Sequence, residues 1–121
     1  LKMAVWTPGS YLIREFQKNI DFVECIINGQ TQRLEKQDKC TWKVNTNGAN
    51  SLTIRYNIYC FEYSVRTNFV EDTHAFINGA ATFLYIDGFE NQETEITIKP
   101  HPTWSNISNT LPHSNGNKWK N

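Results

Sequence analysis

The feature that most constrains this chain is its pattern of turn residues. Five of its six glycines directly follow Asn or Asp, at Asn28-Gly29, Asn47-Gly48, Asn78-Gly79, Asp87-Gly88 and Asn115-Gly116. Asn, Asp and Gly tolerate the positive φ angles that two-residue β-hairpin turns require. The pattern therefore predicts short antiparallel strands joined by Asn-Gly and Asp-Gly hairpins.

Hydrophobicity that alternates with a period of two runs between these turns. It is clearest from Leu52 to Cys60, which predicts a half-buried strand of about nine residues. Further strands are predicted at residues 21–27, 41–44, 82–86 and 94–98, with 82–86 the most fully buried. We expect a turn and then an extended segment over residues 11–20, although its apolar residues also fit a helical spacing. Seven or eight such strands predict an all-β fold, an antiparallel β-sandwich.

Length and charge exclude several classes of protein. The 121 residues suffice for one domain. Twelve basic residues balance twelve acidic ones without long runs of one sign, which argues against a nucleic-acid binder and against a polybasic membrane anchor. No apolar run approaches the ~20 residues of a transmembrane helix, and the first residues do not have the pattern of a signal peptide. We expect no nucleic-acid or membrane partner, and the cellular compartment stays open.

The chain has no recognisable catalytic or metal-binding motif. His74, His101 and His113 are scattered without the spacing of a zinc site. Pro8 and Gly9 before Ser10 predict a type II turn rather than a nucleophile. The cysteines, Cys25, Cys40 and Cys60, favour buried structural thiols, with a disulfide as the alternative.

Charged and aromatic residues provide the remaining candidates. Arg14 and Arg66 lie among apolar residues, so each is expected either to pair with a carboxylate or to face a partner domain or a substrate carboxylate. Aromatic residues occur on both faces of 52–63, which indicates that another domain packs there. The tryptophans leave open a flat platform for sugar rings; they are Trp6, Trp42, Trp104 and Trp119.

Several irregular motifs resemble the N-terminal domain of the glycyl aminopeptidase family of zinc metallopeptidases. They are Val5–Phe16 (VWTPGSYLIREF), Lys39–Trp42, Tyr56–Thr67, Ala75–Gly79 and Pro102–Trp104. The resemblance implies a β-rich domain that precedes a helical catalytic domain, where the zinc ligands and the catalytic glutamate lie. It places no catalytic residue, metal ligand or cofactor in this chain, and it implies zinc in the absent domain.

The resemblance also implies an organisation and a role. Residues 1–100 are expected to form the sandwich, incomplete at its N-terminus. Residues 101–121 are expected to form an irregular tail that leads toward the catalytic domain, or a strand that docks elsewhere. The domain is expected to pack on its own downstream catalytic domain and to shape the cleft for a peptide substrate. The candidate cleft or interdomain residues are Tyr11, Arg14, Glu62, Arg66, Glu71, Asp72, His74 and Asn78.

Two alternatives accompany this interpretation. Strands missing upstream would leave a sheet edge unpaired, and such an edge is a template for another chain. We therefore also expect an edge-to-edge homodimer. The rival function is a free-standing β-sandwich module that binds carbohydrate or a protein partner.

Overall fold

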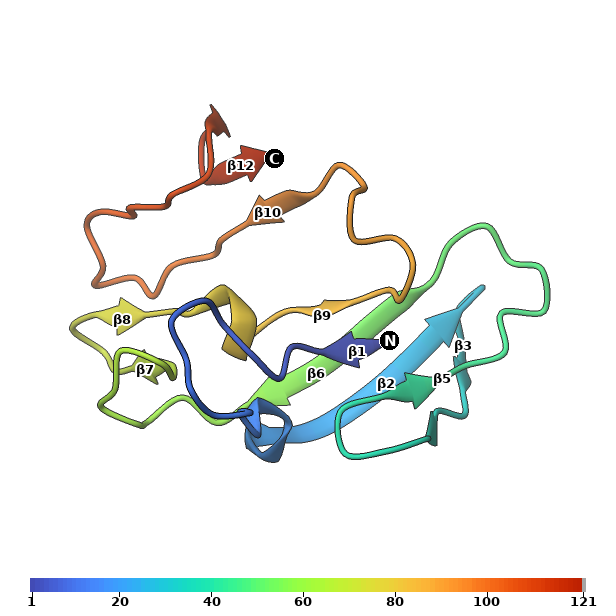
Figure 1. Cartoon of the computed structure of the whole chain (residues 1–121). Coiled ribbons are helices and arrows are strands. Elements are labelled where there is room, and N and C mark those ends of the chain that lie inside the picture. Colours follow the sequence, from blue (N-terminus) through green and yellow to red (C-terminus); the bar gives the residue numbers. More distant parts are fainter. Residues whose placement is uncertain (121) are drawn as a thin grey trace.

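The computed structural model describes residues 1–120, and its regular secondary structure consists almost wholly of short antiparallel strands joined by long loops (Figure 1). The elements are β1 (Lys2–Met3), η1 (Phe16–Asn19), β2 (Ile20–Ile27), β3 (Gln30–Gln32), β4 (Glu35–Lys36), β5 (Trp42–Lys43), β6 (Thr53–Ile58), β7 (Phe69–Val70), β8 (Ala75–Phe76), η2 (Gly79–Ala81), β9 (Leu84–Tyr85), β10 (Glu95–Thr97), β11 (His113–Asn115) and β12 (Lys118–Lys120). The all-β prediction is confirmed, although the strands in residues 1–120 are shorter and more numerous than expected. The elements η1 and η2 are single 3-10 turns, and no helix in the described residues is long and apolar enough to cross a membrane.

The sheet that contains the two longest strands has the order β3-β2-β6. The β2–β3 hairpin turns through Asn28 and Gly29, whose φ angles of 51° and 78° both lie in the left-handed region. A type I′ hairpin turn needs this combination. In β6, exposed residues alternate with partly buried ones, so the predicted period of two is confirmed.

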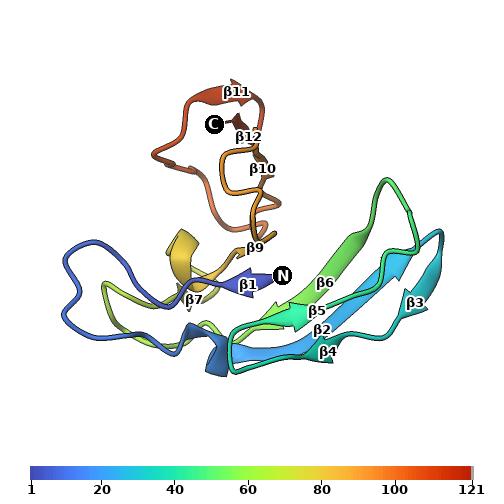
Figure 2. The same ribbon diagram turned by 45° about the vertical axis from the view of Figure 1, so that its right-hand side comes forward.

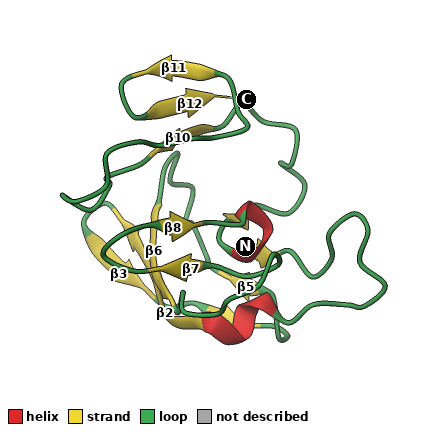
Figure 3. Cartoon of the chain, turned by 90° about the vertical axis from the view of Figure 1, so that its left-hand side faces the viewer, coloured by secondary structure: helices red, strands yellow, loops and turns green. Residues whose placement is uncertain are grey.

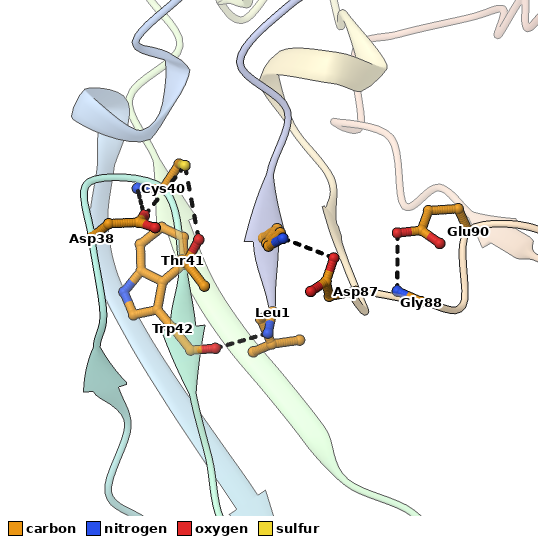
Figure 4. A network of polar contacts seen from close by, with 9 residues as sticks. Leu1, Asp38, Cys40, Thr41, Trp42, Asp87, Gly88 and Glu90 are labelled. Carbon is orange, nitrogen blue, oxygen red and sulfur yellow. Dashed lines mark hydrogen bonds and ion pairs between the residues drawn. The ribbon is translucent and has the colours of Figure 1, made fainter.

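The core lies between this sheet and a second layer that contains β1, β9 and η2 (Figure 2). Met3, Phe16, Trp42 and Ala81 form its buried centre, and side chains from β2 and β9 pack against them. Backbone contacts close the layer: the Leu1 amino group donates a hydrogen bond to Trp42 O at 2.8 Å (Figure 4). The sandwich therefore draws its core from segments that lie far apart between Leu1 and Leu84.

Polar side chains hold the turns beside this core. The Asp38 carboxylate accepts a hydrogen bond from the backbone N–H of Cys40 at 2.8 Å (Figure 4), and this bond contributes most to a lowered pKa of Asp38. The Lys2 ammonium pairs with Asp87 at 2.8 Å and joins β1 to the turn after β9. The first contact stabilises one turn, and the second adds an ion pair to the β1–β9 strand pairing.

A third sheet, of order β10-β12-β11, stands apart from the other two layers in Figure 2. Trp119 of β12 is buried opposite Ile96 of β10. The segment after residue 100 therefore ends in a docked hairpin rather than continuing as an irregular tail. The reason is the burial of one large aromatic ring, because pairing of β12 with β10 removes the apolar surface of Trp119 from water.

Not every predicted turn joins paired strands. Asn115-Gly116 lies in the β11–β12 hairpin, whereas Asn47-Gly48 and Asp87-Gly88 make turns between strands that do not pair with each other. Asn78-Gly79 instead begins η2, where the Asn78 side chain accepts from the Ala80 N–H. The hairpin prediction was wrong at these three places because turn geometry is local and strand pairing is not.

Two further expectations need correction. Residues 16–19 form the 3-10 turn η1 rather than an extended segment, and β2 begins at Ile20. The 82–86 segment contains the short strand β9, but Phe83 and Ile86 are exposed, so this strand is not fully buried. Residues 16–19 still supply Phe16 to the core, whereas Phe83 and Ile86 face outward at its periphery.

Candidate functional site

The three loops that carry the predicted cleft residues lie toward one end of the molecule in Figures 1 and 2. They are residues 8–14, 62–66 and 71–78. Figure 3 looks onto this end, with β7 and β8 toward the viewer. The structure therefore gathers segments that are far apart in the sequence.

The first loop begins with the predicted turn. Gly9 has a φ of 82°, and the Ser10 N–H donates to Thr7 O at 3.1 Å, which is the geometry of a type II turn. Arg14 Nε donates to Ser10 Oγ at 3.0 Å and holds the loop closed. The side chains between them project outward, and Tyr11 is fully exposed.

Exposed apolar side chains concentrate on these loops. Eleven of the fourteen large exposed apolar side chains in the described residues come from segments 6–13, 59–65 and 76–83. We call this set the apolar end; it comprises Trp6, Tyr11, Leu12, Ile13, Tyr59, Phe61, Tyr63, Val65, Phe76, Ile77 and Phe83. Apolar surface gathered in this way is typical of a contact with another protein surface.

A pocket of about 330 Å³ opens within the apolar end, and it is lined by Tyr63, Ser64, Val65, Phe69, His74 and Phe76. Phe69 forms its base and is itself buried. The ring of Phe69 lies 4.4 Å from that of Tyr63 and 5.5 Å from that of His74, measured between centroids. Because the lining is mostly apolar and aromatic, the pocket suits an apolar group.

A larger groove of about 880 Å³ adjoins the pocket and shares His74 and Phe76 with it. Its other walls come from β10 and from residues 104–111. Trp104 Nε1 donates to Glu71 O at 3.3 Å, so the groove wall is tied to the third loop. Pocket and groove are therefore neighbours that share two wall residues.

Asn68 supports this surface from below. Its side chain is almost wholly buried and donates through Nδ2 to Ala81 O at 3.2 Å. Its Oδ1 accepts from the Asn78 N–H at 2.8 Å. Asn78 Nδ2 in turn donates to Arg66 O at 3.0 Å, so Asn78 links the second loop to the third. The sequence did not indicate Asn68 as a site residue, because a single polar residue before an aromatic one forms no recognisable motif.

Charged candidates pair differently from the expectation. Arg14 and Arg66 form no ion pair within residues 1–120; instead Glu15 pairs with Lys39 at 2.8 Å and Glu62 with Lys18 at 3.8 Å. The flexible lysines on η1 and before β5 reach these carboxylates, whereas Arg14 bends back to Ser10. The expected arginine–carboxylate pairs were wrong, and Arg66 is exposed at the apolar end.

The third loop forms a small polar cluster at the edge of the pocket. Glu71 Oε1 lies 2.9 Å from His74 Nδ1, and it also accepts a hydrogen bond from the Thr73 hydroxyl. The backbone carbonyl of Asp72 accepts from the Thr103 hydroxyl. The structure thus brings Glu71 and His74 together at the edge of the pocket, with Asp72 between them in the chain, whereas Asn78 contacts the second loop at Arg66.

The titratable groups whose pKa is raised by burial line neither the pocket nor the groove. Burial raises the pKa of Tyr56, whose hydroxyl donates to Thr82 O at 2.9 Å. Burial likewise raises the pKa of the Cys25 and Cys60 thiols, which keeps both of them protonated. All three cysteines are free thiols, but only Cys25 is buried as expected, while Cys40 and Cys60 are half-buried.

The described residues hold no group of three or more His, Cys, Asp or Glu side chains that fits a metal ion. His101 contacts Thr103, and His113 contacts Gly116 O, so each is engaged locally. A zinc ion therefore does not fit the residues of this part of the chain.

The tryptophans do not form a platform for sugar rings. Trp42 and Trp119 are buried in separate sheets. Trp6 Nε1 donates to Ser10 O at 2.8 Å within the first loop. The four tryptophans therefore form no exposed row in residues 1–120, since two of them serve as core.

Fold and site together define a small all-β domain with a preformed apolar pocket at one end. The chain belongs to the Peptidase M61 N-terminal domain family, whose description matches residues 1–121. M61 is the glycyl aminopeptidase family, so the resemblance found in the sequence is confirmed.

A solved structure agrees with this assignment. The chain is similar to an aminopeptidase N family protein from Idiomarina loihiensis, with 26% sequence identity and a TM-score of 0.80. The similarity covers 100% of this chain and 22% of that protein, so this chain spans about a fifth of its length. No protein with a curated description matches the chain.

Proposed function

We propose that this chain is the non-catalytic N-terminal domain of a zinc metallo-aminopeptidase, which packs on the catalytic domain of the same polypeptide and shapes its substrate cleft. The family match over residues 1–121 carries this proposal. The zinc and its ligands belong to the catalytic domain, where zinc polarises the peptide carbonyl and activates water. This domain contributes shape and polar contacts.

The chemistry of an exopeptidase explains why such a domain is needed. The enzyme must block its cleft beyond the first residue of the substrate, and it must provide a partner for the free α-amino group. A rigid β-domain beside the catalytic domain blocks the cleft sterically. A carboxylate or carbonyl on one of its loops can balance the ammonium charge, because a charge held in a closed pocket needs a partner.

The proposal is tested by alanine substitutions in the full-length enzyme. Tyr11→Ala, Arg66→Ala and Glu71→Ala sample the three loops, and Arg33→Ala and Phe89→Ala are exposed controls outside the apolar end. We expect at least one loop variant to raise KM roughly three- to tenfold, since each 1.4 kcal/mol of lost binding is worth a factor of ten. Peptides with a free and with a blocked amino terminus report exopeptidase selectivity.

Unchanged kcat/KM and selectivity in all three loop variants would contradict a role in the cleft. The domain would then act as a scaffold. Saturable binding of a glycan by the chain alone would instead favour the free-standing binding module.

A further inference from the structure

We propose that the pocket lined by Tyr63, Val65, Phe69, His74 and Phe76 is the anchor of the interdomain contact, and that it receives one apolar side chain from the catalytic domain of the same polypeptide. This inference rests on the proposed function and deepens it, since it selects one place on the apolar end. Four observations support it. The pocket is already formed, its walls are apolar and exposed, charged groups lie near its rim, and the family description is that of one domain of a longer protein.

The pocket is formed before any partner arrives. Its base, Phe69, is only 7% exposed and also stacks on Phe61 with centroids 5.1 Å apart. Beneath it, Asn68 holds β7 to the residues around η2 through bonds to Ala81 and Asn78. A site that is already rigid loses little conformational entropy on binding, which favours affinity.

The walls of the pocket are exposed although they are apolar. Tyr63 is 84% exposed, Val65 80% and Phe76 50%. Side chains of this kind at the centre of an interface contribute most of its binding energy when they are desolvated against a partner. A pocket of about 330 Å³ has room for one leucine, methionine or aromatic side chain.

Charged groups lie near the rim of the pocket, and His74, the partner of Glu71, also forms part of its lining. Glu62 lies 3.8 Å from Lys18, Glu71 lies 2.9 Å from His74, and Arg66, which follows Val65 in the chain, is exposed. Interfaces have this arrangement, with an apolar centre and a polar rim. The adjoining groove, which shares His74 and Phe76, extends the same surface.

The occupant we assign is the remainder of the polypeptide. The similar aminopeptidase is several times longer than this chain, which covers 22% of it, and the family description is that of an N-terminal domain. A covalently linked partner is present at high effective concentration, so even a modest pocket stays filled. A second copy of the chain is the competing occupant, and concentration separates the two.

Hydroxyl-radical footprinting of the full-length protein tests the assignment. Phe61 and Phe89 are each 60% exposed in this structure, and Phe76 and Phe22 are 50% and 45% exposed. We expect Phe61 and Phe76 to be oxidised several-fold more slowly than Phe89 and Phe22 in dilute full-length protein. Val65→Asp should remove that difference, and Ile86→Asp, a matched exposed control, should preserve it.

The other outcomes overturn the anchor in distinguishable ways. Equal oxidation of the paired phenylalanines, with slow oxidation of Tyr11, would move the contact to the first loop and leave the proposed packing intact. Equal oxidation with no protection anywhere on the apolar end would overturn the packing as well. Protection that appears only at high protein concentration would assign the pocket to a second copy, and protection that survives Val65→Asp would assign it to another surface.

Discussion

At the scale of single residues, the site depends on one buried amide. Asn68 meets a backbone carbonyl with its donor and a backbone N–H with its acceptor, and Ala81 and Asn78 supply these partners. Asn68 Oδ1 also lies 3.2 Å from the Thr82 hydroxyl. An apolar residue cannot meet these groups, and an aspartate has no amide donor and adds a buried charge.

We therefore predict that Asn68→Ala destabilises the domain by about 1–3 kcal/mol, because it leaves the Asn78 N–H and Ala81 carbonyl without partners. Urea denaturation followed by tryptophan fluorescence measures the change. Asn91→Ala, at an exposed position, is the control and should lie within about 0.5 kcal/mol of the parent chain. If Asn68→Ala leaves the free energy of unfolding unchanged, the prediction is wrong and water replaces the side-chain amide.

At the scale of elements, the β2–β3 hairpin shows what a local turn can specify. Asn28 and Gly29 both have positive φ, and Ile27 pairs with Gln30 across the turn. The buried side chains of Cys25 and Ile27 then fall on one face of β2. A turn of another length would shift this register and expose them.

Gly29→Ala should lower the free energy of unfolding by about 1 kcal/mol, because an alanine at this positive φ strains the backbone. A Cβ at Gly29 meets nothing within 4 Å, so crowding adds nothing to this value. Gly79→Ala is the contrasting variant, because Gly79 lies outside the positive-φ region and its Cβ would lie 3.6 Å from the Phe83 ring, an ordinary contact. Thermal unfolding of both variants measures their stability, and Gly29→Ala should lose more of it than Gly79→Ala. Equal losses of stability would contradict the explanation by backbone strain.

At the scale of the whole molecule, one long strand edge has no partner strand. β6 pairs with β2 on one side, and no other strand in residues 1–120 pairs with it. Its outward side chains include Arg55, which pairs with Glu24 at 3.4 Å across the sheet. An edge of six residues is long enough to accept a strand from another molecule.

The edge-to-edge homodimer stays a prediction, and β6 is the edge we assign to it. Light scattering on the 1–121 chain should show mass rising with concentration. Asn57→Lys should reduce the dimer, because two like charges then meet across the pairing. Asn91→Lys adds the same charge elsewhere and should leave it unchanged. A monomer at every concentration would contradict the prediction.

The sequence by itself determined the features that depend on a few neighbouring residues. The Pro8-Gly9 turn, the Asn28-Gly29 hairpin and the alternation in β6 follow from local φ preferences and side-chain direction, and the motif at residues 5–16 indicated the family. Tertiary structure decided which turns join paired strands, that Trp119 docks β12 on β10, and that lysines rather than Arg14 and Arg66 meet the glutamates. It also assembled the pocket from Tyr63, Phe69 and Phe76 above Asn68. These outcomes depend on burial and pairing between residues distant along the chain, and no local preference encodes that.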